Sequence, residues 1–106
     1  MKTATTLLLA GSLCIAPLAF ADAGLDRLQK DGCTACHSID KKIVGPAYKD
    51  VAEKYRKDPG AEAKLVEKVK KGGSGVWGQV PMPPNSPQVS DADIKADVAY
   101  ILSLKK

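Results

Sequence analysis

Two cysteines and a histidine lie close enough together in the chain to share one chemical task. They occupy the run Cys33-Thr34-Ala35-Cys36-His37, whose Cys-x-x-Cys-His spacing is the attachment signature of a c-type haem. Two thiols at this spacing can add to the two vinyl groups of one porphyrin, and the adjacent imidazole then lies beneath the iron as an axial ligand. The sequence therefore predicts one covalently attached haem c.

Met82 is the candidate for the second axial ligand. His37 is the single histidine of the chain, and Met82 is its one methionine besides Met1. Low-spin haem iron is commonly held by one histidine nitrogen and one methionine sulfur. A lone methionine often only fills a core, but prolines at 81 and 83 stiffen this segment and lower the cost of presenting a thioether to iron.

The N-terminal segment, residues 1–21, has the pattern of a secretory signal peptide. A lysine precedes an apolar stretch over 6–20, and residues 19–21 form a small-x-small cleavage site, which is typical of such leaders. The apolar stretch is short and broken by a glycine and a proline, which disfavours a retained membrane anchor. We expect a mature single domain over 22–106, exported to the periplasm.

Other uses of the paired cysteines remain open. Structural zinc usually takes four Cys or His ligands, and the mature chain offers three. A thioredoxin-like redox motif belongs beside a βαβ unit, which a helical chain lacks. A disulfide is the ordinary outcome in an oxidising compartment. The histidine that follows directly favours haem over all three.

Four helices are expected to position these groups, so the predicted fold class is all-α, wrapped around one haem. Asp22, Asp58 and Ser90 are predicted to begin the first, third and last helices, and Pro46 the second. A glycine- and proline-rich loop over 72–89 carries Met82, and loops of this length are usually functional. The expected helices cover about 22–31, 46–57, 58–71 and 90–106.

The mature chain is near the size at which a side-chain core alone is marginally stable. A covalently held haem supplies the missing apolar body. Residues that recur at helical spacing are expected to pack around it: Tyr48, Val51, Tyr55, Leu65, Val69, Val98 and Ile101.

These motifs together resemble the bacterial class I cytochromes c of the c-551 type. The likeness extends over nearly all of 22–106 and is carried by GCTACH at 32–37, VGPAYKDVA at 44–52 and GVWGQVPMPPN at 75–85. Residues 55–59 and 86–88 depart from the pattern and affect loop geometry. The resemblance implies a small helical shell in which the N- and C-terminal helices cross and one haem edge is exposed.

The resemblance also implies supporting roles near the iron. The Pro46 carbonyl would accept a hydrogen bond from His37 and orient its ring, although Pro46 also suits a helix start. The Trp77 N–H would reach a haem propionate, with simple packing as the alternative. Asn85 would donate to the Met82 sulfur, or else serve only as a turn residue.

The charge pattern points to protein partners. The chain has 16 Lys and Arg against 12 Asp and Glu, for a net charge of +4, which removal of the leader lowers to +3. The lysines form either a solvated coat or a surface that steers the protein to acidic partners. We expect no nucleic-acid binding, no membrane span in the mature chain, and a monomer.

The predicted function is that of a periplasmic monohaem electron carrier, not an enzyme, since His37 and Met82 would saturate the iron. By resemblance, a quinol-oxidising complex or another cytochrome reduces it, and nitrite reductase, a terminal oxidase or a peroxidase oxidises it. One alternative is a haem-based ligand-binding or sensor protein with an open sixth coordination position. Another is a structural or copper-handling protein that uses the two cysteines and Met82.

Overall fold

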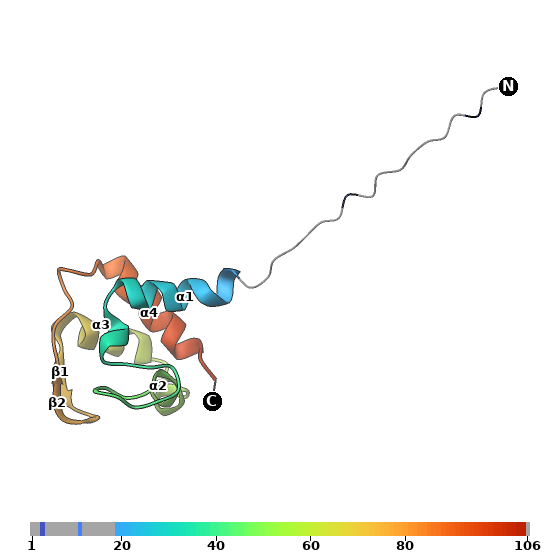
Figure 1. Cartoon of the computed structure of the whole chain (residues 1–106). Helices are drawn as coiled ribbons and strands as arrows, with labels where there is room; N and C mark the ends of the chain where they lie inside the picture. The colour runs from blue at the N-terminus through green and yellow to red at the C-terminus, as the bar shows by residue number, and fades with distance from the viewer. Residues whose placement is uncertain (1–2, 4–10, 12–18, 106) are drawn as a thin grey trace.

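The computed structural model describes residues 3, 11 and 19–105. Residues 1–18 of the predicted signal peptide, apart from 3 and 11, lie outside the described residues, as does Lys106. Four α-helices dominate the described chain (Figure 1), which confirms the all-α class. The elements in order are α1 (Ala19–Lys30), the 3₁₀ helix η1 (Cys33–Ala35), α2 (Tyr48–Tyr55), α3 (Ala61–Lys71), β1 (Gly73–Gly75), β2 (Gly78–Met82) and α4 (Asp91–Ser103).

Helix α4 is the centre of the fold, and α1, α2 and α3 all pack against it. The α1 and α4 helices cross (Figure 1), as expected for the N- and C-terminal helices. Leu28 and Ile94 are 0% exposed and Val98 is 1% exposed. Full burial of one such side chain contributes roughly 1.5–3 kcal/mol, so these residues fix α1 on α4.

The last helix begins where its sequence predicts. Ser90 precedes α4 in an extended conformation, and its Oγ accepts a hydrogen bond from the Asp93 backbone N–H at 3.1 Å. Asp91 and Asp93 lie in the first turn, where the helix dipole favours negative charge. Helix α3 likewise ends at Lys71, with Gly72 directly after it as expected.

The other helix starts differ from the predictions. Helix α1 already begins at Ala19, so Asp22 does not precede it. Helix α2 begins at Tyr48 after an extended Ala47, which leaves Pro46 outside the helix. Asp58 caps a turn rather than α3: its Oδ1 accepts from the Gly60 N–H at 2.9 Å, and α3 begins only at Ala61.

The predicted loop over 72–89 contains a β-hairpin that was not expected. Strands β1 and β2 are antiparallel, with Gly73 opposite Met82 and Gly75 opposite Gly78. The hairpin is exposed along almost its whole length, so no alternation of apolar and polar residues marks it. Gly75 and Gly78 have φ angles of 118° and 116°, which side chains with a Cβ rarely adopt. The hairpin brings Met82 to a fixed place beside α3.

Candidate functional site

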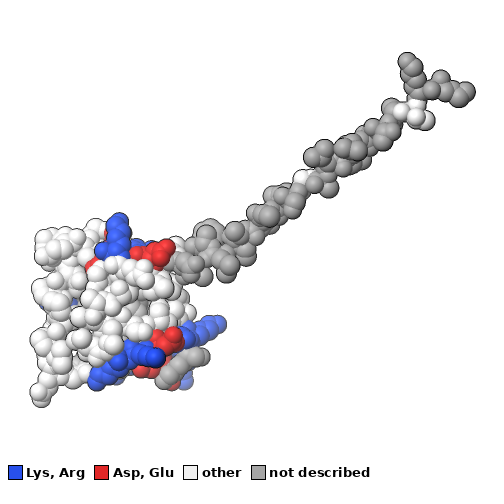
Figure 2. Space-filling model, in the orientation of Figure 1, with Lys and Arg blue, Asp and Glu red and all other residues white. Residues whose placement is uncertain are grey.

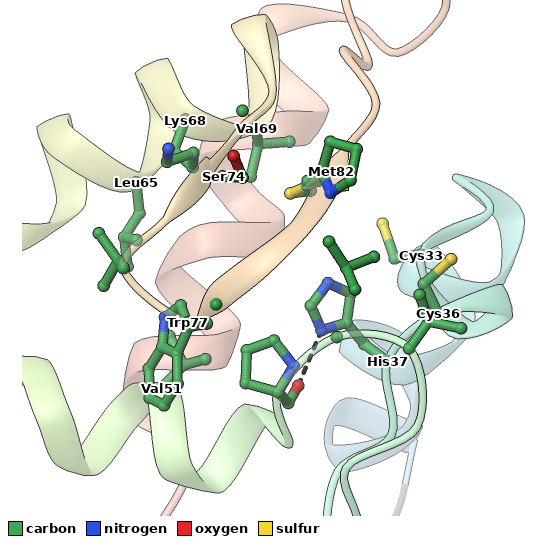
Figure 3. A pocket seen from close by; sticks show the side chains of 18 of the residues that line it. Cys33, Cys36, His37, Val51, Leu65, Lys68, Val69, Ser74, Trp77 and Met82 are labelled. Atoms are coloured by element: carbon green, nitrogen blue, oxygen red, sulfur yellow. Dashed lines mark hydrogen bonds between the residues drawn. The ribbon is translucent and has the colours of Figure 1, made fainter.

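A cavity of about 480 Å³ lies between the Cys33–His37 segment, α2, α3, α4 and the hairpin. Its volume is in the range of pockets that hold small ligands and cofactors. Figure 3 shows the Met82 side chain and the His37 ring reaching into this space, with the sulfurs of Cys33 and Cys36 beside it. Six residues predicted to pack around the porphyrin also line it: Tyr48, Val51, Leu65, Val69, Val98 and Ile101.

The other predicted packing residue, Tyr55, lies outside this lining. Tyr55 is half-buried and packs against the core cluster that Leu28, Tyr48, Val51 and Ile101 form. It therefore supports the cavity wall from behind rather than facing the cofactor.

The two cysteines are held side by side by a tight turn. The backbone N–H groups of Cys36 and His37 both donate to the Cys33 carbonyl, at 3.3 and 3.1 Å. Both cysteines are half-buried and carry free thiols. The structure thus leaves both sulfurs available to a porphyrin rather than joining them to each other.

The acidity of Cys33 distinguishes it from a redox-active cysteine. Burial, followed by the nearby carboxylates of Asp97 and Asp31, raises the pKa of the Cys33 thiol to about 11. Thioredoxin-like cysteines have depressed pKa values, since the thiolate is their reactive form. The environment of Cys33 therefore disfavours thiol–disulfide exchange. The zinc alternative also finds no support, because no group of three or more His, Cys, Asp and Glu side chains in 19–105 is arranged to hold a metal ion.

The His37 ring is held from three sides. Its Nδ1 lies 2.8 Å from the Pro46 carbonyl oxygen (Figure 3), and its plane stacks on Tyr48 with 4.8 Å between ring centroids. Gly45 closes the third side, where a Cβ would overlap the ring. A donated Nδ1–H leaves Nε2 as the nitrogen with a free lone pair.

The hairpin and α3 position Met82. Met82 pairs with Gly73 at the end of the β-ladder. Pro81 and Pro83, on either side of Met82 in the sequence, also line the cavity. The Met82 side chain is half-buried. A neutral thioether and an imidazole nitrogen thus open into one apolar cavity beside two thiols, and this donor set fits a covalently attached, axially ligated haem.

Asn85 makes different contacts from those expected. Its Nδ2 donates to the Val69 and Pro83 carbonyl oxygens, both at 3.2 Å. An amide nitrogen has two hydrogens, and these two acceptors account for both, so the structure shows no bond to the Met82 sulfur. The Asn85 backbone N–H also donates to Val69, at 3.0 Å. Asn85 therefore ties the chain that follows Met82 onto α3.

Trp77 lies at the mouth of the cavity. It lines the cavity and is 41% exposed, with the Lys54 ammonium 5.5 Å from the indole ring. Its bond to a haem propionate stays a prediction. The mouth also carries exposed apolar residues that the sequence analysis did not single out: Ile43, Val44, Val76 and Val80.

The hairpin itself, residues 73–82, contains no charged residue. In Figure 2 the lysines, arginines and carboxylates lie at the upper and lower margins of the visible face, and its middle is uncharged. Exposed apolar surface with a charged margin is typical of protein interaction sites.

Asp97 is the functional candidate that the sequence analysis missed. It lines the cavity and is 3% exposed, and its Oδ1 accepts from Arg27 Nε at 2.7 Å. Burial and the neighbouring Asp31 carboxyl raise the pKa of Asp97 to about 7, against the opposing effect of Arg27. The available signal was its place on the apolar face of α4, three residues after Ile94 and four before Ile101.

Comparisons with known proteins agree with this geometry. The model of the cytochrome c family matches residues 22–105. Cytochrome c-551 of Allochromatium vinosum is 59% identical over 93 residues, which cover 88% of this chain and 96% of that protein. Cytochrome c-552 of Nitrosomonas europaea is 52% identical over 96 residues, covering 91% and 90%.

Solved structures give the same result. The crystal structure of wild-type Nitrosomonas europaea cytochrome c552 matches with a TM-score of 0.73 and 53% identity, over 76% of this chain and 99% of that one. The class 1 cytochrome MtoD of Sideroxydans lithotrophicus matches with a TM-score of 0.69 and 36% identity, over 80% and 96%. The chain therefore belongs to the cytochrome c family, as a class I electron carrier of the c-551 type with one covalently attached haem c.

Proposed function

We propose that this protein is a periplasmic electron carrier in which His37 and Met82 are the axial ligands of the haem iron. Cys33 and Cys36 hold the thioether bonds. The observation that carries the proposal is the convergence of His37 and Met82 in one apolar cavity beside two free thiols. When bound, the haem supplies a one-electron ferric–ferrous couple.

The chain contributes orientation to this site. The hydrogen bond from His37 Nδ1 to the Pro46 oxygen, 2.8 Å long, fixes the ring orientation and would leave Nε2 free to ligate the haem iron. The hairpin and the flanking prolines hold Met82. Two ligands that are held in place leave no coordination position for a substrate, so we propose electron transfer without catalysis.

Electrons are proposed to pass at the mouth of the cavity. The exposed apolar residues there allow close approach of another protein. Lys54 lies over the Trp77 ring, and Lys68 lines the cavity. Lysines at this position favour acidic partner surfaces. The proposed donors are a quinol-oxidising complex or another cytochrome, and the proposed acceptors are nitrite reductase, a terminal oxidase or a peroxidase.

We also propose that residues 1–21 are a cleaved signal peptide and that the mature monomer begins at Asp22. The family match begins at residue 22, directly after the predicted cleavage site. No helix among residues 19–105 is long and apolar enough to cross a membrane.

Replacement of the proposed sulfur ligand tests the function. We expect ferrous wild-type protein not to bind carbon monoxide, because both axial positions are filled. Met82→Ala should bind it rapidly and have a lower reduction potential, since a thioether ligand raises the potential. Absorbance spectroscopy under carbon monoxide and a redox titration measure both effects.

The control is Val80→Ala, which changes a 65% exposed side chain on the same strand. This variant should keep the wild-type spectrum and remain inert to carbon monoxide. Rapid carbon monoxide binding by the wild type, or an unchanged spectrum in Met82→Ala, would remove Met82 from the iron.

A further inference from the structure

Helix α4 places a carboxyl group inside the haem cavity that the proposed function does not use. Asp97 lines the cavity and is 3% exposed, beside the fully buried Val98. An ionised carboxylate in an apolar site is costly unless it is well paired. Its pairing therefore decides whether Asp97 holds a charge or a proton.

The pairing of Asp97 is incomplete. Arg27 of α1 supplies one ion pair, from Nε to Oδ1 at 2.7 Å. Asp31, just beyond α1, adds a second carboxyl that interacts with the Asp97 side chain. One ion pair for two neighbouring carboxyl groups leaves them with an excess of negative charge.

A buried oxygen in this cluster also lacks a donor. Within the described part of the chain, Asp31 Oδ2 is buried and has no hydrogen-bond partner. Such an oxygen has lost its hydration without gaining a hydrogen bond, which destabilises the ionised pair. A proton on Asp97 would supply the missing donor and remove the excess charge together, so the burial and the unpaired oxygen favour a protonated Asp97.

Tyr48, Cys33 and Lys68 line the same cavity as Asp97. Burial raises the pKa of the Tyr48 phenol on α2 and of the Cys33 thiol in η1, so both are neutral at physiological pH, and Cys33 becomes a thioether in the haem protein. Lys68 of α3 lines the same cavity. Burial and Asp31 together raise the pKa of Asp97 to about 7, where small changes in the cavity alter its protonation.

We propose that Asp97 couples electron transfer to proton transfer. As the bound haem takes up one electron from the donor protein, the Asp97 carboxylate would bind one proton from solvent and become a neutral carboxylic acid. Oxidation releases both. The cause is electrostatic: reduction removes one positive charge from the cavity, so the negative carboxylate is less stabilised there. The proposal rests on the haem cavity and extends electron carriage to proton-coupled transfer.

The test is the reduction potential of the intact haem protein as a function of pH. The wild-type potential should fall as the pH rises through a window around neutrality. If the ferrous state binds the proton tenfold more tightly, the fall across the window is about 59 mV. Asp97→Asn should abolish it. Asp91→Asn, which changes a 71% exposed side chain on the same helix, should retain it.

Two further variants should shift the pH window of the potential in opposite directions. Arg27→Gln removes the cation that stabilises the carboxylate, so the window should move to higher pH. Asp31→Asn removes the like charge, so it should move to lower pH. These two variants keep the proposal testable if Asp97→Asn does not fold.

Infrared spectroscopy identifies the proton carrier directly. The reduced-minus-oxidised difference spectrum should contain the C=O band of a neutral carboxylic acid, which Asp97→Asn should lose. A pH window that survives in Asp97→Asn would assign it to a haem propionate, and shifts of Arg27→Gln and Asp31→Asn in the same direction would also overturn the proposal. Failure of the proposed axial ligation would show in the absorbance spectrum instead and would leave the potential–pH profile readable.

Discussion

The imidazole of His37 has no free space on the side of its loop. Gly45 lies so close that any Cβ at this position would overlap the ring, and Tyr48 stacks on it with an interplanar angle of 15°. The ring orientation is therefore set by packing as well as by the bond from Nδ1 to the Pro46 oxygen.

Gly45→Ala should displace the ring and destabilise the protein. Overpacking of this kind costs about 1–3 kcal/mol, and the displaced Nδ1 proton should exchange faster with solvent. Denaturant unfolding of the haem protein measures the first effect and proton NMR the second. Lys41→Ala in the same loop, at an exposed position, should change stability by less than about 0.5 kcal/mol. Equal effects of the two substitutions would contradict the packing argument.

Residues whose role depends on covalent spacing were predictable from the sequence. Cys33, Cys36 and His37 lie together in the structure because five consecutive residues in a tight turn have few ways to be arranged. The contacts of Asn85 were not predictable, since they depend on where α3 presents the Val69 carbonyl. Asp97 was missed because a charged residue on an apolar helix face becomes significant only when Arg27 and Asp31 lie opposite it.

At the scale of elements, α4 carries the largest share of the packing, so its start matters to the whole fold. The Ser90 hydroxyl oxygen satisfies the Asp93 N–H, which lies in the first turn and has no partner within the helix. Ser90→Ala should therefore destabilise the protein by about 1 kcal/mol.

Denaturant midpoints of the haem protein measure this loss. The control is Ser103→Ala at the other end of α4, where the hydroxyl donates to the Tyr100 carbonyl from an exposed position. We expect this change to be within about 0.5 kcal/mol of neutral. A Ser90→Ala variant as stable as Ser103→Ala would show that the cap contributes nothing.

Helices were easier to predict than the hairpin for a physical reason. Helices α1, α2 and α3 each bury one stripe of side chains against α4. Apolar residues therefore recur at helical spacing in the sequence. Strands β1 and β2 are exposed, so burial imposes no pattern on them. The exact starts of α2 and α3 also escaped prediction, because Pro46 and Asp58 suit a preceding turn as well as a helix.

For the molecule as a whole, the all-α class followed from apolar residues at helical spacing, and the need for a cofactor followed from the small size of the chain. The cavity is lined by the Cys33–His37 segment, α2, α3, α4 and the hairpin, and the residues predicted to pack around the haem come from α2, α3 and α4. What the sequence could not show is where the shell opens, because the mouth is formed by loops and the hairpin. The exposed Ile43, Val76 and Val80 mark that opening only in three dimensions.

The mouth combines apolar surface with positive charge, and this combination predicts how the protein meets charged reagents. Lys54 lies over the Trp77 ring, so its charge acts at the point where electrons are proposed to leave. Lys54→Gln should slow oxidation of the ferrous protein by the anionic complex hexacyanoferrate(III) a few-fold at low salt, as stopped-flow absorbance would measure. Because the Debye length falls from about 10 Å at 0.1 M to about 3 Å at 1 M, the difference from wild type should disappear at high salt.

The control is Lys64→Gln, which removes the same charge from a residue that pairs with Asp58 at 2.8 Å and does not line the cavity. Equal slowing by both variants would mean that the net charge, and not the mouth of the cavity, governs encounter.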